Sequence, residues 1–268
     1  MAKKDVAKVD AGVPAELEDE FLEDVEEFEE SLTQDDMAVP FLQVLQALSP
    51  QVTDGEDQFI EGAQKGQLFN TVSKECYNGK EGVTIVPVRY KHSFIEWVPR
   101  EDGGGFVSEW SPEDRPDIHT SRNDRNQDII VEGSPKGTSG NQIVDTATHY
   151  VLIVSDKGDP QPAVMSMSST QFKVSRNWNS QISMRTVQTS KGKKRPPRFW
   201  DAWTLKSVLN KNDQGSWYGY DLTRQSETRE LDNGVELMDA ARAFARAIGA
   251  GEKSANYGKE ETSDEPPF

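Results

Sequence analysis

Residues 171–212 combine the two residue types that hold a flexible polyanion. This stretch contains ten basic residues and a single acid, Asp201, so its local net charge is +9. The same stretch contains the aromatic residues Phe172, Trp178, Phe199, Trp200 and Trp203. Its basic residues are Lys173, Arg176, Arg185, Lys191, Lys193, Lys194, Arg195, Arg198, Lys206 and Lys211. Because the chain as a whole is acidic, with a net charge of −16, this concentration predicts one surface of opposite sign.

Two kinds of chemistry follow from this composition. Lys and Arg side chains displace condensed counterions from phosphates, and exposed aromatic rings stack on unpaired bases, each stack contributing about 1–3 kcal/mol. We predict that phosphates are contacted by Lys173, Arg176, Lys191, Lys193, Lys194, Arg195 and Arg198. Trp178, Trp200 and Trp203 are the stacking candidates, and Arg89, Tyr90 and Lys91 could extend the same surface. Two alternatives stay open: the rings are core residues covered by the bases, or the basic surface receives the chain's own acidic ends.

Acidic residues gather at the two ends of the chain. Residues 1–36 have a net charge of −11, residues 252–268 of −3, and the remainder of only −2. Blocks of like charge are usually solvated and often serve as interaction tails. We therefore expect an acidic N-terminal segment at 1–36, flexible or forming an amphipathic helix over 15–32, and a disordered acidic tail at 251–268.

The segment between these ends, residues 37–250, reads as a compact domain rich in strands. Runs of β-branched and aromatic residues bounded by glycine or proline are typical of strands. They predict strands near 83–98, 106–110, 128–132, 147–155, 163–168, 199–209 and 217–222. Helical spacing of apolar residues predicts helices over about 170–187 and 235–248. The expected fold is mainly β with peripheral helices, built on an OB-fold-like β-barrel core.

Other classes of protein find no support in the residues. Cys76 is the single cysteine and His92, His119 and His149 lie far apart, so we expect no metal and no cofactor. Gly103–Gly105 lacks the spacing of a nucleotide-binding loop, and no nucleophile motif occurs, so we expect no enzyme. No run approaches the ~20 apolar residues of a membrane helix, and no secretory signal is seen. We therefore expect a cytoplasmic protein without membrane contact.

The last five residues form a distinct motif, Asp264-Glu265-Pro266-Pro267-Phe268. A terminal phenylalanine on a polar, acidic tail has no core to join, which favours a peptide anchor for a partner protein. The motif resembles the acidic tip of bacterial and tailed-phage single-stranded DNA-binding proteins. The runs FLQVLQALSPQ, VPVRYKHSFIEWVPR and STQFKVSRNW are similar in character to phage proteins of this kind. This resemblance implies an OB-fold that holds single strands and a tail that recruits replication, recombination and repair proteins.

The sequence thus predicts a protein that binds single-stranded DNA without sequence preference in phage DNA replication or recombination, in the host cytoplasm. Three alternatives remain: a structural or assembly protein of the virion, a recombination protein that anneals single strands, and an enzyme of unfamiliar type. Whether the chain forms a homo-oligomer is left open.

Overall fold

A computed structural model of the protein describes residues 39–154, 160–213, 215–251, 253–255 and 257. All of them belong to the second of two units into which the chain divides, Ala38–Phe268. The predictions for residues 1–36, including the helix over 15–32, lie outside the described residues. The same holds for Asp264, Glu265, Pro266, Pro267 and Phe268.

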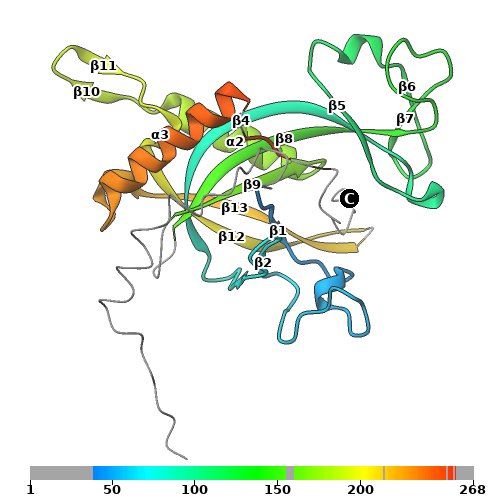
Figure 1. The fold of residues 1–268 in the computed structure, drawn as a ribbon, viewed down its shortest axis with the longest axis horizontal. Helices are drawn as coiled ribbons and strands as arrows, with labels where there is room; N and C mark the ends of the chain where they lie inside the picture. Colours follow the sequence, from blue (N-terminus) through cyan, green and yellow to red (C-terminus); the bar gives the residue numbers. More distant parts are fainter. Residues whose placement is uncertain (1–38, 155–159, 214, 252, 256, 258–268) are drawn as a thin grey trace, which may run out of the picture. The chain divides into compact units, whose positions relative to one another are not determined.

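The described unit is built around one large, open antiparallel sheet (Figure 1). Its strands run in the order β13-β12-β4-β8-β7-β6, with β5 added beside β4 and β9 beside β8. The strands are β4 (Val83–Trp97), β5 (Phe106–Trp110), β6 (Thr120–Arg122), β7 (Asp128–Ile130), β8 (Gln142–Val154), β9 (Gln161–Ser168), β12 (Asp201–Asn212) and β13 (Gly215–Glu227). Strand β4 changes neighbours along its length, since Val83–Ile85 pair with β12 whereas Phe94–Trp97 pair with β5.

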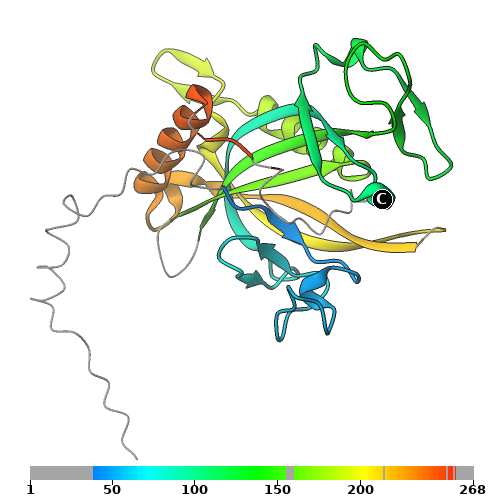
Figure 2. The same ribbon diagram turned by 45° about the vertical axis from the view of Figure 1, so that its right-hand side comes forward.

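Two smaller sheets accompany the large one. The first contains β1 (Leu42–Val44), β2 (Leu68–Asn70) and β3 (Cys76–Tyr77). The second is the hairpin β10 (Val187–Thr189) and β11 (Gly192–Lys194). In the two views of Figures 1 and 2, this hairpin stands out from the sheet as a separate arm near α3.

Helices α2 (Gln171–Met184) and α3 (Gly234–Ala250) pack against opposite faces of the large sheet. Trp178 and Ile182 of α2 belong to the same buried cluster as Ile85, whereas Phe244 of α3 belongs to the cluster that contains Val86. Because successive side chains of a strand point to opposite faces, this division of neighbouring residues places one helix on each side.

The expected fold class, mainly β with peripheral helices, is confirmed. Residues 83–98 form one long strand with an irregularity between Pro87 and Arg89, rather than two strands. The last helix ends as expected at Gly251, whose φ of 80° is the left-handed conformation that glycine tolerates. Residues 190–197 were expected only to break the preceding helix, but they contribute β11 of the hairpin. The OB-fold identity stays a prediction.

Candidate nucleic-acid interface

The exposed cations of α2 and of the β10–β11 hairpin form one surface without acids. No Asp or Glu occurs between residues 160 and 200. None of the exposed basic side chains in this part of the structure forms an ion pair with a described residue. We call them the basic surface: Lys173, Arg176, Lys191, Lys193, Lys194 and Arg195. Their positive charge is therefore not neutralised by the described part of the chain, so it is available to an external anion.

The hairpin is closed at its tip by a tight turn. Gly192 has a φ of +97°, and the Thr189 hydroxyl donates to the Gly192 carbonyl oxygen at 2.7 Å. The strands pair from Val187 opposite Lys194 to Thr189 opposite Gly192. This geometry holds the lysines of the hairpin on a short, defined element instead of a loose loop.

The root of the hairpin is held by paired charges. Arg185 lies just before β10, and its Nε and Nη2 reach Asp201 at 3.2 Å and Glu227 at 2.8 Å. Asp201 also accepts from Nη2 of Arg224 at 2.8 Å, and Glu227 from Nε of Arg229 at 2.7 Å. The hairpin thus has neutralised arginines at its base and unpaired lysines beyond it.

The structure contradicts two of the three stacking predictions. Trp178 and Trp203 are each 1% exposed and contact one another, with ring centroids 5.9 Å apart. Trp178 also lies 4.6 Å from the ring of His149. Both tryptophans are core residues because α2 lays one side on the sheet, so neither can face a base. Trp200, the third candidate, is half-buried beneath the guanidinium of Arg229, which lies 5.6 Å from its ring centroid.

The prediction for Arg198 is also wrong, because this side chain is turned inward. Its Nη2 donates to Oδ1 of Asn179 at 2.8 Å, and its guanidinium lies 5.7 Å from the ring centroid of Tyr90. Burial lowers the pKa of Arg198 to about 10. Tyr90 in turn packs against the core cluster of α2, so this pair stabilises the interior rather than extending the basic surface.

Arg89 and Lys91, predicted to extend the surface, are engaged elsewhere. Arg89 Nη1 donates to the carbonyl oxygen of Ala245 at 3.1 Å, in the last part of α3, where a cation is favourable. Lys91 Nζ forms an ion pair with Glu109 of β5 at 2.6 Å. These contacts are on α3 and β5, whereas Tyr90 between them packs toward α2, as strand alternation requires.

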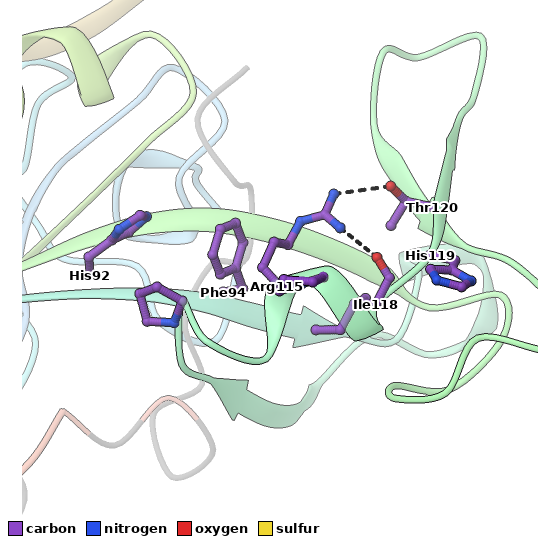
Figure 3. Close-up of a pocket in the computed structure, with 8 residues that line it drawn as sticks. His92, Phe94, Arg115, Ile118, His119 and Thr120 are labelled. Carbon is purple, nitrogen blue, oxygen red and sulfur yellow. Dashed lines mark hydrogen bonds between the residues drawn. The ribbon is translucent and has the colours of Figure 1, made fainter.

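A row of rings and cations runs from the basic surface across β4. Arg176 lies 5.6 Å from the ring of Phe172, which lies 5.4 Å from His92. His92 lies 5.3 Å from Phe94, and Arg115 lies 5.6 Å from the Phe94 ring. We call these five residues the stacked row. Figure 3 shows its far end, with the Arg115 guanidinium beside Phe94 and His92 farther along the strand.

Arg115 at this end is held by neutral groups. Its guanidinium donates to the Ile118 carbonyl oxygen and, at 3.2 Å, to Oγ1 of Thr120. The neighbouring carboxylates are occupied by Lys136, which is hydrogen-bonded to Asp114 and lies 3.6 Å from Asp117. Hydrogen bonds from Lys136 and Ser111 lower the pKa of Asp114 to about 2.

A shallow pocket of about 650 Å³ opens beside Arg115. It is lined by His92, Phe94, Pro112, Arg115, Pro116, Ile118, His119 and Thr120, none of them acidic (Figure 3). One carboxylate lies close to the row, since Asp145 Oδ1 is 2.6 Å from Nε2 of His92. The sequence analysis assigned no role to these residues. The available signals were the spacing of His92 and Phe94 along one strand face and of Phe172 and Arg176 along one helix face.

A second hollow, which we call the groove, lies between β1, β13 and the loop that follows β4. Its volume is about 620 Å³. Rings and amides line it, among them Trp97, Trp217, Tyr218, Gln43 and Gln142. Its charged lining residues, Arg100, Glu101, Asp102 and Arg125, sum to zero. The groove therefore offers apolar and hydrogen-bonding contacts without net charge.

Two searches of the described residues bear on other functions. No group of three or more His, Cys, Asp or Glu side chains in this part of the chain could hold a metal ion. Among the helices described, none combines the length and apolar character needed to cross a bilayer.

Comparison with known proteins gives a family for this chain. No curated protein and no solved structure matches it. The profile of the family described as "Pam3 phage gp34-like protein" matches residues 7–254. Because this match covers most of the 268 residues, the chain belongs to the Pam3 phage gp34-like family.

Proposed function

We propose that this protein binds single-stranded DNA without sequence preference, as a non-enzymatic protein of phage DNA replication or recombination. The observation that carries the proposal is the basic surface, where six exposed cations on α2 and the hairpin have no carboxylate partner among the described residues. Contacts to phosphates carry no sequence information, which accounts for the lack of preference.

The preference for single strands rests on the row of rings next to these cations. A ring gains little from bases that are already stacked in a duplex, whereas the unpaired bases of a single strand can stack on it. Phe172 connects the two features, because it is half-buried and lies under Arg176 of the basic surface.

Fluorescence anisotropy of a labelled oligo(dT), with a duplex of the same length as control, tests the proposal. We expect tighter binding to the single strand and a log–log salt slope of up to about −4, since each phosphate contact on a single strand contributes about −0.7. Absence of binding at low salt would overturn the proposal. If the protein then forms a defined higher oligomer in light scattering, a role in virion assembly takes its place.

The C-terminal motif, residues 264–268, is proposed to recruit replication or recombination proteins. Its acids would steer the encounter, and Phe268 would fill a partner's pocket. Deletion of Asp264, Glu265, Pro266, Pro267 and Phe268 should leave affinity for oligo(dT) unchanged or increased and abolish co-purification of phage or host replication proteins. A clear loss of DNA affinity after this deletion would contradict the assignment.

A further inference from the structure

We infer that the stacked row is the platform on which the bases of the bound strand lie, and that the strand continues from the basic surface along β4 into the pocket beside Arg115. This inference rests on the proposed function and adds the path of the strand and the residues that contact its bases. It transfers the stacking role from the predicted tryptophans to Phe172, His92 and Phe94.

The distances support a continuous path. Successive members of the row, from Arg176 to Arg115, are separated by 5.6, 5.4, 5.3 and 5.6 Å. No member is fully buried, and the side chain of His92 is 34% exposed. A single strand places consecutive bases at a similar spacing when it is partly extended, so several neighbouring bases can contact the row at once.

The alternation of charge and ring matches what a strand presents. Arg176 and Arg115 stand at the two ends, and three rings lie between them. Guanidinium groups bind phosphate and also stack on bases, while the rings accept bases of any sequence. The pocket at the Arg115 end contains His119 and no acid, so it tolerates the phosphates that accompany the bases.

The carboxylates near the row do not reverse its charge. Asp145 is hydrogen-bonded to His92, and Asp114 and Asp117 are held by Lys136. Arg115 itself contacts only a carbonyl and a hydroxyl among the described residues. The arrangement therefore leaves the guanidinium at the end of the row without a competing anion from the described chain.

The test compares oligo(dT) with an abasic oligonucleotide of the same length, which has the phosphates but no bases. The full-length protein should bind oligo(dT) at least tenfold more tightly at the same salt concentration. Phe94→Leu and Phe172→Leu keep apolar volume but remove the ring, so each should reduce affinity for oligo(dT) about five- to tenfold. Neither should change affinity for the abasic strand or the salt slope. Phe59→Leu, at an exposed phenylalanine outside the row, is the matched control.

The arginines give a second readout that does not depend on packing. Arg115→Gln and Arg176→Gln should each make the log–log salt slope less negative by about 0.7. Circular dichroism and a thermal melt establish that every variant is folded, and the arginine variants decide the matter where a phenylalanine variant is not.

The outcomes separate this inference from the proposed function. If the protein binds neither oligonucleotide at low salt, the proposed function fails. If it binds both equally well, or if folded Phe94→Leu and Phe172→Leu keep the full preference for oligo(dT), the platform inference is wrong while the proposed function stands. An unchanged salt slope in both arginine variants would equally remove the row from the path.

Discussion

The stacked row and the groove are two ring-lined regions of similar volume but different charge. The pocket at the end of the row and the groove measure about 650 and 620 Å³. The row is bounded by Arg176 and Arg115 and joins the basic surface, whereas the charges of the groove lining cancel. The groove is the site that shape alone would select, since amides and rings favour a neutral organic ligand.

The difference between them shows that rings become a site for a charged polymer only where unpaired cations continue the surface. The same contrast applies within the basic stretch itself. Arg185 is neutralised by Asp201 and Glu227, while the lysines a few residues later have no carboxylate partner among the described residues. The predictions below test this division of labour, from the largest effect to the smallest.

Trp178→Ala should cause the largest loss, in stability rather than in binding. Removing a fully buried tryptophan costs roughly 3–5 kcal/mol of unfolding free energy, and Trp178 packs on Trp203 and His149. Urea unfolding measures this loss. Trp178→Phe should cost less and leave the affinity of the folded protein for oligo(dT) unchanged. A stable Trp178→Phe variant that loses binding would return this ring to the interface.

Neutralising the hairpin should have the largest effect on binding. Changing Lys191, Lys193, Lys194 and Arg195 to glutamine should weaken binding of oligo(dT) about 100-fold at low salt and make the salt slope less negative by about 3. Anisotropy titrations at several salt concentrations measure both. As a matched pair, Lys193→Gln/Lys194→Gln is compared with Lys74→Gln/Lys80→Gln, which removes the same charge from exposed lysines elsewhere. Equal losses in the two pairs would mean that net charge, and not the hairpin, governs binding.

Asp201→Asn should destabilise the root of the hairpin. The Asp201 side chain is 7% exposed and accepts from Arg185 and Arg224, so its removal leaves two guanidinium groups short of a partner. We expect a loss of about 1–3 kcal/mol in urea unfolding, less than for a fully buried pair because both arginines are partly exposed. The control is Asp239→Asn, whose exposed ion pair with Arg242 should contribute under about 0.5 kcal/mol. Equal effects at both sites would contradict a structural role for Asp201.

Lowering the pH should destabilise the protein through His149. This imidazole is buried, its Nε2 is 2.8 Å from the Ser175 hydroxyl, and burial together with the charge of Arg198 lowers its pKa well below 6.5. The unfolded state therefore binds a proton that the folded state excludes, so stability is full above about pH 6.5 and falls below it by up to about 1.4 kcal/mol per pH unit. Urea unfolding between pH 5 and 7.5 measures the slope. The same slope in His149→Gln would assign the effect to other groups.

Trp217→Leu, in the groove, should have the smallest effect. If bases lie on the stacked row, affinity for oligo(dT) and the preference over an abasic strand should change less than twofold. The anisotropy comparison that tests Phe94 and Phe172 measures this directly. A loss of base preference in Trp217→Leu, with Phe94→Leu unaffected, would exchange the roles of the two regions.

Several elements of the fold follow from local pattern. Alternation and β-branched residues predict β5 at its observed bounds, Phe106–Trp110, and helical spacing with a terminal glycine predicts α3. The hairpin β10–β11 was not predicted, because Ser190, Lys191 and Gly192 look like a simple helix break and three-residue strands leave little periodicity to detect.

The candidate site shows where local pattern ends. Charge counting identified the basic surface, since six of its seven predicted phosphate contacts are exposed. It misplaced Arg198, whose inward position depends on Asn179 and Tyr90. The stacked row combines residues 92 and 94 of β4 with 115, 172 and 176, and no spacing in one segment reports on the others.

The sequence by itself determined the segregation of charge: acid-free residues 160–200, a basic stretch within an acidic chain, and the run of strands that carries it. Only the tertiary structure decided which rings are buried and which cations are neutralised. The physical reason is that both depend on contacts between distant segments. Trp178 is core because Trp203 meets it, and Arg185 is neutral because Asp201 and Glu227 reach it, whereas Lys193 and Lys194 meet no described carboxylate.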